Sequence, residues 1–355
     1  MVTRGLATLN LAATLSKLDF FCRKCDIKTL KKVSFLLGSR EGTTKSALRD
    51  ELLAQGGLLA KLRNTGGVAG SLNLVAVDIG VENFAFCRLA LRADEARSQL
   101  VEWSKMQLSN GDDTSKFSPS VSAQLAKNLT QRLSRLGPSV FVLERQRTRT
   151  AGSANVFEHV LRANVLEHVL FTLLQNQRFL GDDSLQHQVY SSDPRRMTEF
   201  WCKFIGVTSP GNLEGSNDQA KSSKTATKSL KIKIAKAIIA AALSSDLASL
   251  PTFVPTVAPA VKSQLVSYFN KGKRLNLFDA LQLTTDAGRR KEDDLADALL
   301  HGLSWLTWVT NFDRLGQLLA KTTCDETGLQ QFKSRVQLLT VEHVKATNAI
   351  LLHIT

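Results

Sequence analysis

The apolar residues of the first 65 positions recur at helical spacing. They form two faces, separated by the glycine-containing segment 38–42. Thr43 or Thr44 can cap the second helix, because a hydroxyl before a helix accepts a hydrogen bond from a free backbone N–H. The two faces consist of Leu30, Val33, Leu36 and Leu37, and then of Leu48, Leu52 and Leu53. Residues 19–65 are therefore expected to form a small helical unit.

After residue 70 the pattern changes to β-branched apolar runs that predict strands. The expected strands are 72–80, 83–91, 101–108, 139–144 and 188–194. An amphipathic helix at 123–136 and a longer one at 154–177 are expected between the later strands. The longer helix is apolar on most sides, so it should pack on the sheet or on a second subunit.

The chain carries 46 Lys and Arg against 32 Asp and Glu, a formal net charge of +14 in 355 residues. This balance favours a polyanionic partner, either nucleic acid or an anionic membrane face. No stretch approaches the roughly 18 apolar residues of a membrane span, so no membrane partner is expected. Five scattered cysteines indicate a reducing compartment rather than a disulfide framework.

Positive charge is concentrated in the segment 195–236, which holds nine basic residues and three acids. Its Gly-, Ser-, Asn- and Thr-rich part, 206–229, is expected to be a mobile loop. We interpret 206–236 as a mobile basic insertion that tracks phosphates, against the alternative of a solvated face. The DNA-binding candidates of the segment are Arg195, Arg196, Lys231 and Lys233.

Residues 1–18 contain no acid, and their basic residues are Arg4 and Lys17, among Thr, Ser, Leu and Ala. This composition is typical of a mitochondrial presequence. An ordinary N-terminal segment is the alternative.

Five acids occupy positions from which they can act together. Asp78 and Glu144 each close an apolar strand, whereas Asp293, Asp294 and Asp297 open a C-terminal helix. On that helix Asp297 can share a face with either Asp294 or Asp293. Carboxylates gathered at strand ends need a cation, and hard oxygen ligands select Mg²⁺ or Mn²⁺, which activate water for phosphodiester hydrolysis. Each acid alone is also common at a strand end or a helix start, so the hypothesis depends on their combination.

Four segments have a specific composition and order: 77–86, 144–150, 191–198 and 293–297. They resemble the fungal mitochondrial cruciform-cutting endonucleases, the mitochondrial relatives of bacterial RuvC in the ribonuclease H-like superfamily. The resemblance covers residues 17–310, and the string Glu-Arg-Gln-Arg-Thr-Arg-Thr at 144–150 is its most specific part.

The resemblance implies an α/β fold of the ribonuclease H-like type, a mixed sheet flanked by helices, in a nuclease domain at 71–310. A helical extension at 311–355 would follow. The resemblance also implies a homodimer in the mitochondrial matrix that nicks four-way (Holliday) DNA junctions symmetrically with Mg²⁺, for which Mn²⁺ can substitute. Catalytic and metal-binding roles fall on Asp78, Glu144 and Asp297, with Asp294 or Asp293 as a fourth acid.

Arginines follow the second acid of the set. Arg145, Arg147 and Arg149 alternate, so an extended backbone puts all three on one side, where guanidinium groups can hold phosphates. Arg290 and Lys291 precede the acidic helix and either contact the same phosphate or balance the acids after them. His301, one turn beyond the acids, is more often a packed helix residue than a ligand.

The stretch 42–48 resembles the loop and second helix of a SAP-type DNA-binding module, which adds Lys45 to the DNA-binding candidates. A helical hairpin used only for packing is the alternative. Two other functions are compatible with the same residues. One is a nuclease of the same superfamily that acts on RNA–DNA hybrids, and the other is a non-catalytic protein that packages or bends mitochondrial DNA.

Overall fold

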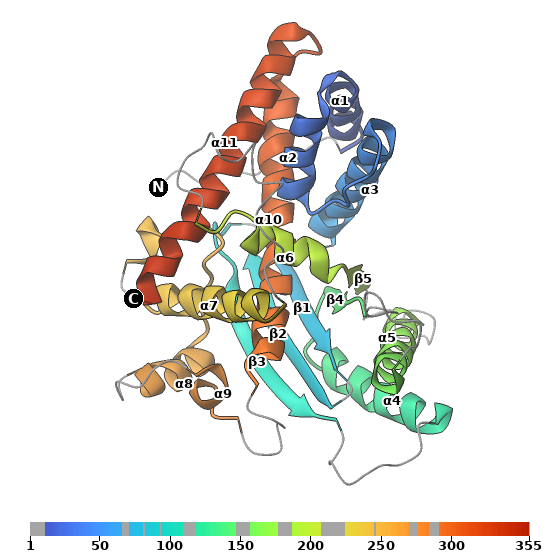
Figure 1. The fold of residues 1–355 in the computed structure, drawn as a ribbon, viewed down its shortest axis with the longest axis vertical. Coiled ribbons are helices and arrows are strands. Elements are labelled where there is room, and N and C mark those ends of the chain that lie inside the picture. The colour runs from blue at the N-terminus through green and yellow to red at the C-terminus, as the bar shows by residue number, and fades with distance from the viewer. Residues whose placement is uncertain are drawn as a thin grey trace.

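The computed structural model describes residues 11–65, 71–80, 82–92, 94–108, 118–146, 157–176, 187–206, 224–244, 246–269, 276–283 and 291–354 (Figure 1). The strands are β1 (Ser71–Ile79), β2 (Asn83–Arg92), β3 (Gln99–Gln107), β4 (Val140–Glu144), β5 (Gln188–Ser192) and β6 (Thr256–Val257). The helices are α1 (Leu11–Lys24), α2 (Ile27–Leu37), α3 (Lys45–Asn64), α4 (Pro119–Ser134), α5 (Glu158–Asn176), α6 (Pro194–Cys202), α7 (Lys224–Ala242), α8 (Pro259–Phe269), α9 (Leu277–Ala280), α10 (Asp293–Lys321) and α11 (Glu326–Ile350). Within these ranges, no helix has the length and apolar character that crossing a membrane requires.

The described strands form one mixed sheet in the order β5-β4-β1-β2-β3-β6. β1, β2 and β3 are antiparallel neighbours, whereas β4 runs parallel to β1 and β5 runs parallel to β4. Helices cover both faces of the sheet. The expected α/β fold with a mixed sheet flanked by helices is therefore confirmed.

Alternate residues of the central strand face two different apolar layers, because successive side chains of a strand point to opposite faces. Leu74 and Ala76 lie in the layer that contains α10, whereas Val75 and Val77 face α4 and α5. α4 and α5 form a pair that is set apart from α10 and α7 (Figure 1). Gly302 lets α10 approach β2 closely, since a Cβ there would lie 2.7 Å from a methyl carbon of Leu89.

The N-terminal helices α1, α2 and α3 pack on the second half of α10 and on α11 (Figure 1). Asp26 caps α2 and Thr44 caps α3, each by accepting from a backbone N–H. Their buried leucines belong to the same apolar cluster as α10, so this unit shares its core with the rest of the chain. The helical unit is present, and its likeness to a SAP-type module stays a prediction.

Two helices of the structure run through regions where domain boundaries were expected. α10 runs without interruption through the boundary expected at 310, where Asn311 is buried and donates to the backbone oxygen of Leu36. The mobile insertion expected at 206–236 overlaps α7, whose Ile234 and Ile238 are buried in the core beside α10. Residues 207–223 of that insertion lie outside the described residues.

The expected presequence at 1–18 overlaps α1. Residues 1–10 lie outside the described residues, whereas Leu18 is buried and Lys17 donates to the backbone oxygens of Leu319 and Thr322, both at 2.8 Å. Cleavage after residue 18 would remove these contacts with the end of α10. The presequence boundary stays a prediction.

α2 ends where it meets the middle of α10. Gly38 takes a left-handed conformation with φ 66° and donates to the backbone oxygen of Ser34. A Cβ on Gly38 would lie 2.3 Å from the indole of Trp308, which is almost fully buried. Arg196 of α6 donates to the backbone oxygen of Gly38, so α6 is tied to the same point.

His343 of α11 lies in an aromatic cluster that joins three helices. It stacks on Phe200 of α6 with ring centroids 4.0 Å apart, and Phe35 of α2 contacts both rings. Nε2 of His343 lies 3.0 Å from the backbone oxygen of Phe200, which can only accept, so Nε2 carries the hydrogen. Burial lowers the pKa of His343 from 6.5 to about 4, because a charged ring would lose its hydration there.

We expect His343 to make the fold acid-sensitive. Its folded pKa lies below its unfolded pKa, so the unfolded chain takes up the proton first. The contribution of His343 to the stability of the fold is therefore complete above the unfolded pKa of 6.5, and it is lost as the pH falls toward 4. The loss in the free energy of unfolding amounts to about 3 kcal/mol. Urea unfolding at pH 7 and pH 4 would measure it, with His343→Phe as the comparison, since Phe keeps a buried ring but takes no proton. If the His343→Phe protein lost as much stability between pH 7 and pH 4 as the unmodified chain, His343 would not be the cause of the acid sensitivity.

Candidate metal centre

Two strand ends and one helix bring three carboxylates together. Asp78 lies next to the end of β1, and Glu144 is the last residue of β4, which pairs with β1 in parallel. Because parallel neighbours end at the same edge of the sheet, these two acids meet there. Asp297, in the second turn of α10, completes the group, and one oxygen from each of the three lies within 4.8 Å of the others.

The three carboxylates disturb one another's ionisation. Burial raises the pKa of Asp78 well above its ordinary value, and the neighbouring charge of Glu144 raises it further. Burial opposes ionisation of Glu144 as well, yet His301 and the shared contact with Asp78 hold its pKa below the ordinary value. Burial raises the pKa of Asp297 to about 6, although the charge of Lys231 acts in the opposite direction. Such mutual repulsion in a small space is what a bound cation relieves.

The donor set fits a hard divalent cation. All three ligands are carboxylate oxygens, which Mg²⁺ and Mn²⁺ prefer. Oδ1 of Asp297 is buried and has no hydrogen-bond partner among the described residues, so one ligand atom is left for an ion. The residues that would hold the ion are Asp78, Glu144 and Asp297.

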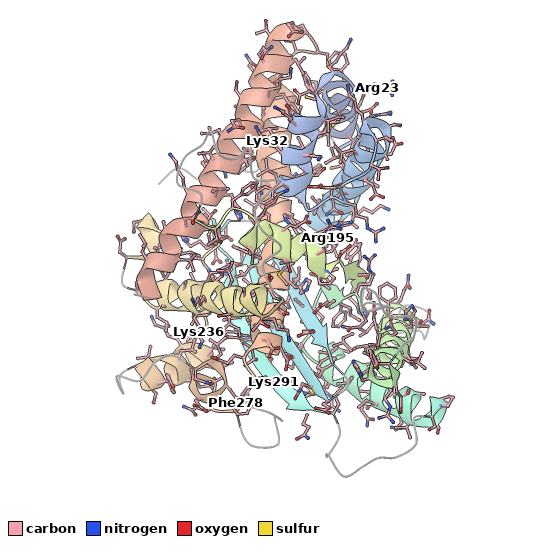
Figure 2. All side chains as sticks on the ribbon, in the orientation of Figure 1. Arg23, Lys32, Arg195, Lys236, Phe278 and Lys291 are labelled. Atoms are coloured by element: carbon pink, nitrogen blue, oxygen red, sulfur yellow. The ribbon has the colours of Figure 1, made fainter. Side chains whose placement is uncertain are left out.

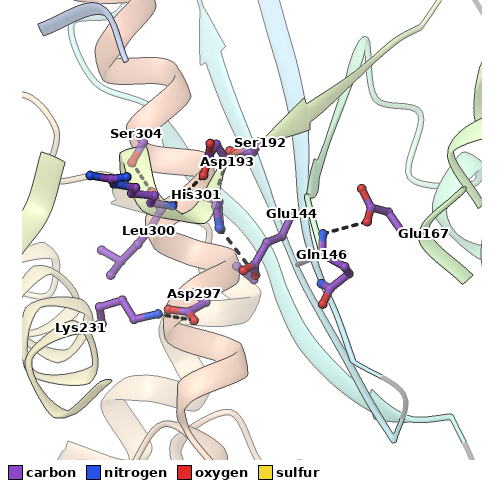
Figure 3. Close-up of polar contacts among 12 residues, drawn as sticks. Glu144, Gln146, Glu167, Ser192, Asp193, Lys231, Asp297, Leu300, His301 and Ser304 are labelled. Carbon is purple, nitrogen blue, oxygen red and sulfur yellow. Dashed lines mark hydrogen bonds and ion pairs between the residues drawn. The ribbon is translucent and has the colours of Figure 1, made fainter. Parts of the chain in front are cut away.

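Lysines of α7 lie against the acidic start of α10, and Figure 3 shows one of them, Lys231, beside Asp297. Nζ of Lys231 is 2.5 Å from Oδ2 of Asp297, and the lysine side chain is only 10% exposed. Lys228, which is exposed, pairs with Asp293 at 2.8 Å. Lys231, expected to bind DNA, is thus placed inside the acidic group.

The two adjacent acids at the start of α10 have different partners. Asp294 pairs at 2.6 Å with Lys105 of β3, whose side chain is fully buried. The negative charge of Asp294 also reaches Asp78, where it contributes to the raised pKa of that residue. Asp293 points to the exposed Lys228 instead. Neither residue belongs to the group of three carboxylates. Of the two, Asp294 is the one whose charge raises the pKa of Asp78.

The other DNA-binding candidates are spread over the surface. Arg145 follows Glu144 and pairs with Asp193 at 2.6 Å. Arg195 is largely exposed on α6 and Lys291 precedes α10, at the upper and lower ends of the sheet in Figure 2. Of the remaining candidates, Lys233 and Lys45 are exposed and Arg196 is half-buried against Gly38, whereas Arg147, Arg149 and Arg290 lie outside the described residues. Their role in DNA binding stays a prediction.

A family model described as mitochondrial resolvase Ydc2 / RNA splicing MRS1 matches residues 74–315. The chain belongs to this family. The motif-based resemblance to the mitochondrial cruciform-cutting endonucleases is therefore confirmed.

Two curated relatives align over almost the whole chain. Cruciform cutting endonuclease 1 of Saccharomyces cerevisiae, a protein named mitochondrial, is 32% identical over 92% of this chain and 94% of its own length. The mitochondrial RNA-splicing protein MRS1 of the same organism is 23% identical over 94% of this chain and 95% of its own length. The Thermus thermophilus RuvC structure matches 36% of this chain and 68% of its own chain, with 13% identity and a TM-score of 0.26.

Three residues that support the site in this family member were not expected from the sequence. Lys105 lies two residues after Trp103, on the same buried face of β3. A lysine at such a buried position indicates an acidic partner, here Asp294. Glu167 is buried on the apolar face of α5 and accepts from the backbone N–H of Gln146 at 2.8 Å, two residues after the strand-end acid Glu144. Asp193 caps α6 and anchors Arg145. For Lys105 and Glu167, the signal was a charged residue within an apolar pattern.

Proposed function

We propose that this chain is a divalent-metal-dependent endonuclease that resolves four-way DNA junctions as a homodimer. The observation that carries the proposal is the meeting of Asp78, Glu144 and Asp297 at one edge of the sheet. A family member that the chain matches over 94% of its length is named a cruciform cutting endonuclease. A net charge of +14 suits a polyanionic substrate.

In this proposal the chain's own residues position an ion and a phosphate. Asp78, Glu144 and Asp297 hold the ion, with Asp294 as the fourth ligand rather than Asp293, because Asp294 acts on the pKa of Asp78. A bound Mg²⁺ or Mn²⁺ supplies a water of lowered pKa and offsets the charge that develops on the phosphate oxygens.

The basic side chains next to the acids would orient the DNA strand. Arg145 is anchored by Asp193 through one nitrogen, and 42% of its side chain is exposed, so it keeps donors for a phosphate. Lys231 adds a positive charge beside Asp297. Together they favour a sugar–phosphate chain that passes over the acidic edge of the sheet.

The test compares substrates of the same sequence. The purified full chain is incubated with a four-way junction, a linear DNA duplex and an RNA–DNA hybrid, with Mg²⁺, Mn²⁺ or a chelator. We expect paired nicks in opposed strands of the junction, with either metal, and none with the chelator. Faster cutting of the hybrid would support the related hybrid nuclease instead. Tight junction binding without cutting under either metal would support a packaging or bending protein.

A homodimer would present two acidic sites to two opposed strands of a junction. Its proposed interface includes α4 and α5, because large apolar side chains on these helices or next to them are exposed: Val121 (48%), Phe157 (52%) and Leu161 (47%). Exposed apolar side chains on paired helices are typical of subunit contacts.

We therefore expect Leu161→Glu to weaken the dimer at least about tenfold, because a buried unpaired charge is costly in an interface. Light scattering after gel filtration, over a range of concentrations, measures the effect. Leu338→Glu is the matched control, since Leu338 on α11 is also 47% exposed but lies on another helix. An unmodified chain that is monomeric, or equal behaviour of the two variants, would contradict the interface.

The splicing relative favours a second candidate function, RNA binding without cutting. Competition between the junction and a structured RNA for the chain would detect it. Either function would take place in the mitochondrial matrix in our proposal, because the relatives are named mitochondrial. Microscopy of a fluorescent C-terminal fusion would test that location.

A further inference from the structure

A buried chain of polar side chains lies directly behind Glu144. Nε1 of Trp305 donates to Oγ of Ser192 at 2.9 Å, and the same Oγ lies 2.9 Å from Nδ1 of His301. The imidazole of His301 is fully buried, and its Nε2 faces Oε2 of Glu144 at 3.6 Å (Figure 3). Nε2 makes no hydrogen bond within the described ranges. α10 supplies the indole and the imidazole, and β5 supplies the serine.

The hydrogens of this chain can be assigned from what each group is able to do. The indole N–H of Trp305 can only donate, so Oγ of Ser192 accepts from it. The Ser192 side chain is buried, and Nδ1 of His301 is the acceptor that the described residues offer to its hydroxyl hydrogen. A buried hydroxyl without an acceptor would be costly, so Ser192 donates to Nδ1. The ring hydrogen of neutral His301 is then on Nε2, which faces Glu144.

We propose that His301 is a positioning residue that holds the carboxylate of Glu144 through an Nε2–H whose tautomer is set by Ser192 and Trp305. The proposal rests on the metal-dependent cutting proposed above. At 3.6 Å the contact is longer than a full hydrogen bond, and such contacts tighten when a site is loaded. Partners of this kind, behind a metal ligand, typically change metal affinity ten- to a hundredfold.

Ser192 also holds the main chain next to Glu144. Its backbone oxygen accepts from the backbone N–H of Arg145 at 2.8 Å, just after the end of β4. The same residue therefore fixes the carboxylate of Glu144, through His301, and the backbone that follows it. This arrangement couples the end of β5 to the orientation of a residue on β4.

The first readout is the tautomer of His301 in the full chain without DNA. Ring ¹H–¹⁵N spectra of ¹⁵N-histidine protein distinguish a protonated nitrogen from an unprotonated one, and His301→Gln assigns the signal by its loss. We expect a protonated Nε2 and an unprotonated Nδ1, and a mixture of the two tautomers in Ser192→Ala. A protonated Nδ1 in the unmodified chain would overturn the proposal, whatever the activity.

The second readout is Mn²⁺ affinity, measured by calorimetry without substrate. Ser192→Ala should weaken Mn²⁺ binding about tenfold. Ser304→Ala is the matched control, since Ser304 is also a buried serine that accepts from an indole, that of Trp201 at 2.8 Å. It should bind Mn²⁺ within twofold of the unmodified chain.

Variants of His301 itself separate positioning from packing. Gln places an amide N–H near the position of Nε2, so His301→Gln should bind Mn²⁺ more tightly than His301→Leu. Equal losses of Mn²⁺ affinity in the two His301 variants, or in the two serine variants, would show that these residues have a merely structural role and would overturn the proposal. If the variants bound Mn²⁺ with the expected order of affinities but the unmodified chain cut no junction, the proposed function would be refuted and the positioning role of His301 would remain supported. Absence of Mn²⁺ binding in the unmodified chain would overturn both.

Discussion

Asp297→Asn should lower the rate of junction cutting about a thousandfold or more, because loss of one carboxylate removes several kcal/mol of support for the ion and its water. Oδ1 of Asp297 is buried without a partner among the described residues, and Asn at this position offers a weaker, neutral ligand. Junction binding should be unchanged or tighter, since a negative charge next to the phosphate is removed. Single-turnover cleavage in Mg²⁺ and gel-shift titration in Ca²⁺ would measure the two effects.

A matched carboxylate on the same helix provides the control. Asp313 is 18% exposed and faces Arg63 at 2.8 Å, whereas Asp297 is 15% exposed and faces Lys231 at 2.5 Å. Asp313→Asn should therefore lose a similar ion pair and retain cutting within about twofold. Asp78→Asn should behave like Asp297→Asn. Unchanged cutting by pure Asp297→Asn protein would refute the acidic group as the source of activity.

Gly38→Ala should lower the free energy of unfolding by about 4 kcal/mol, the combined effect of a left-handed backbone and an overfilled contact. Gly38 has φ 66°, and the new Cβ would lie 2.3 Å from the ring of Trp308. The ring cannot move away easily, because it is 1% exposed and is packed between α2 and α6. Urea unfolding at neutral pH, followed by tryptophan fluorescence, would measure the loss.

The opposite result is expected at a glycine of the neighbouring helix. Gly57 lies inside α3, and a Cβ there would meet nothing within 4 Å. Gly57→Ala should raise the free energy of unfolding by about 0.5–1 kcal/mol, because alanine restricts the unfolded chain and favours the helix. If both alanine variants had the same stability, the close packing of Gly38 on Trp308 would be contradicted.

Local patterns were sufficient for the central part of the fold. β1 and β2 were expected as strands from their apolar runs, and acids at the ends of two such runs predicted that Asp78 and Glu144 could meet. Asp297 was predicted from its spacing on a helix. The structure brings these three together because a parallel pair of strands and a helix crossing them share one edge of the sheet.

Features that depend on distant partners could not be predicted in this way. The segment 224–236 reads as a basic insertion because lysines dominate its composition, and its helical packing depends on α10, more than fifty residues away. Spacing alone left Asp293 and Asp294 equivalent, whereas the buried Lys105 on β3 distinguishes them. The role of Ser192 depends on two residues over a hundred positions away.

α10 is one uninterrupted helix that reaches from the acidic group to the N-terminal helices. Asp297 lies near one end of it, and sixteen residues later Asp313 pairs with Arg63 of α3. At 1.5 Å per residue, the Asp313–Arg63 pair lies about 24 Å from Asp297 along the helix axis. One unbroken helix therefore holds the carboxylate of Asp297 and the ion pair with α3 at a fixed separation.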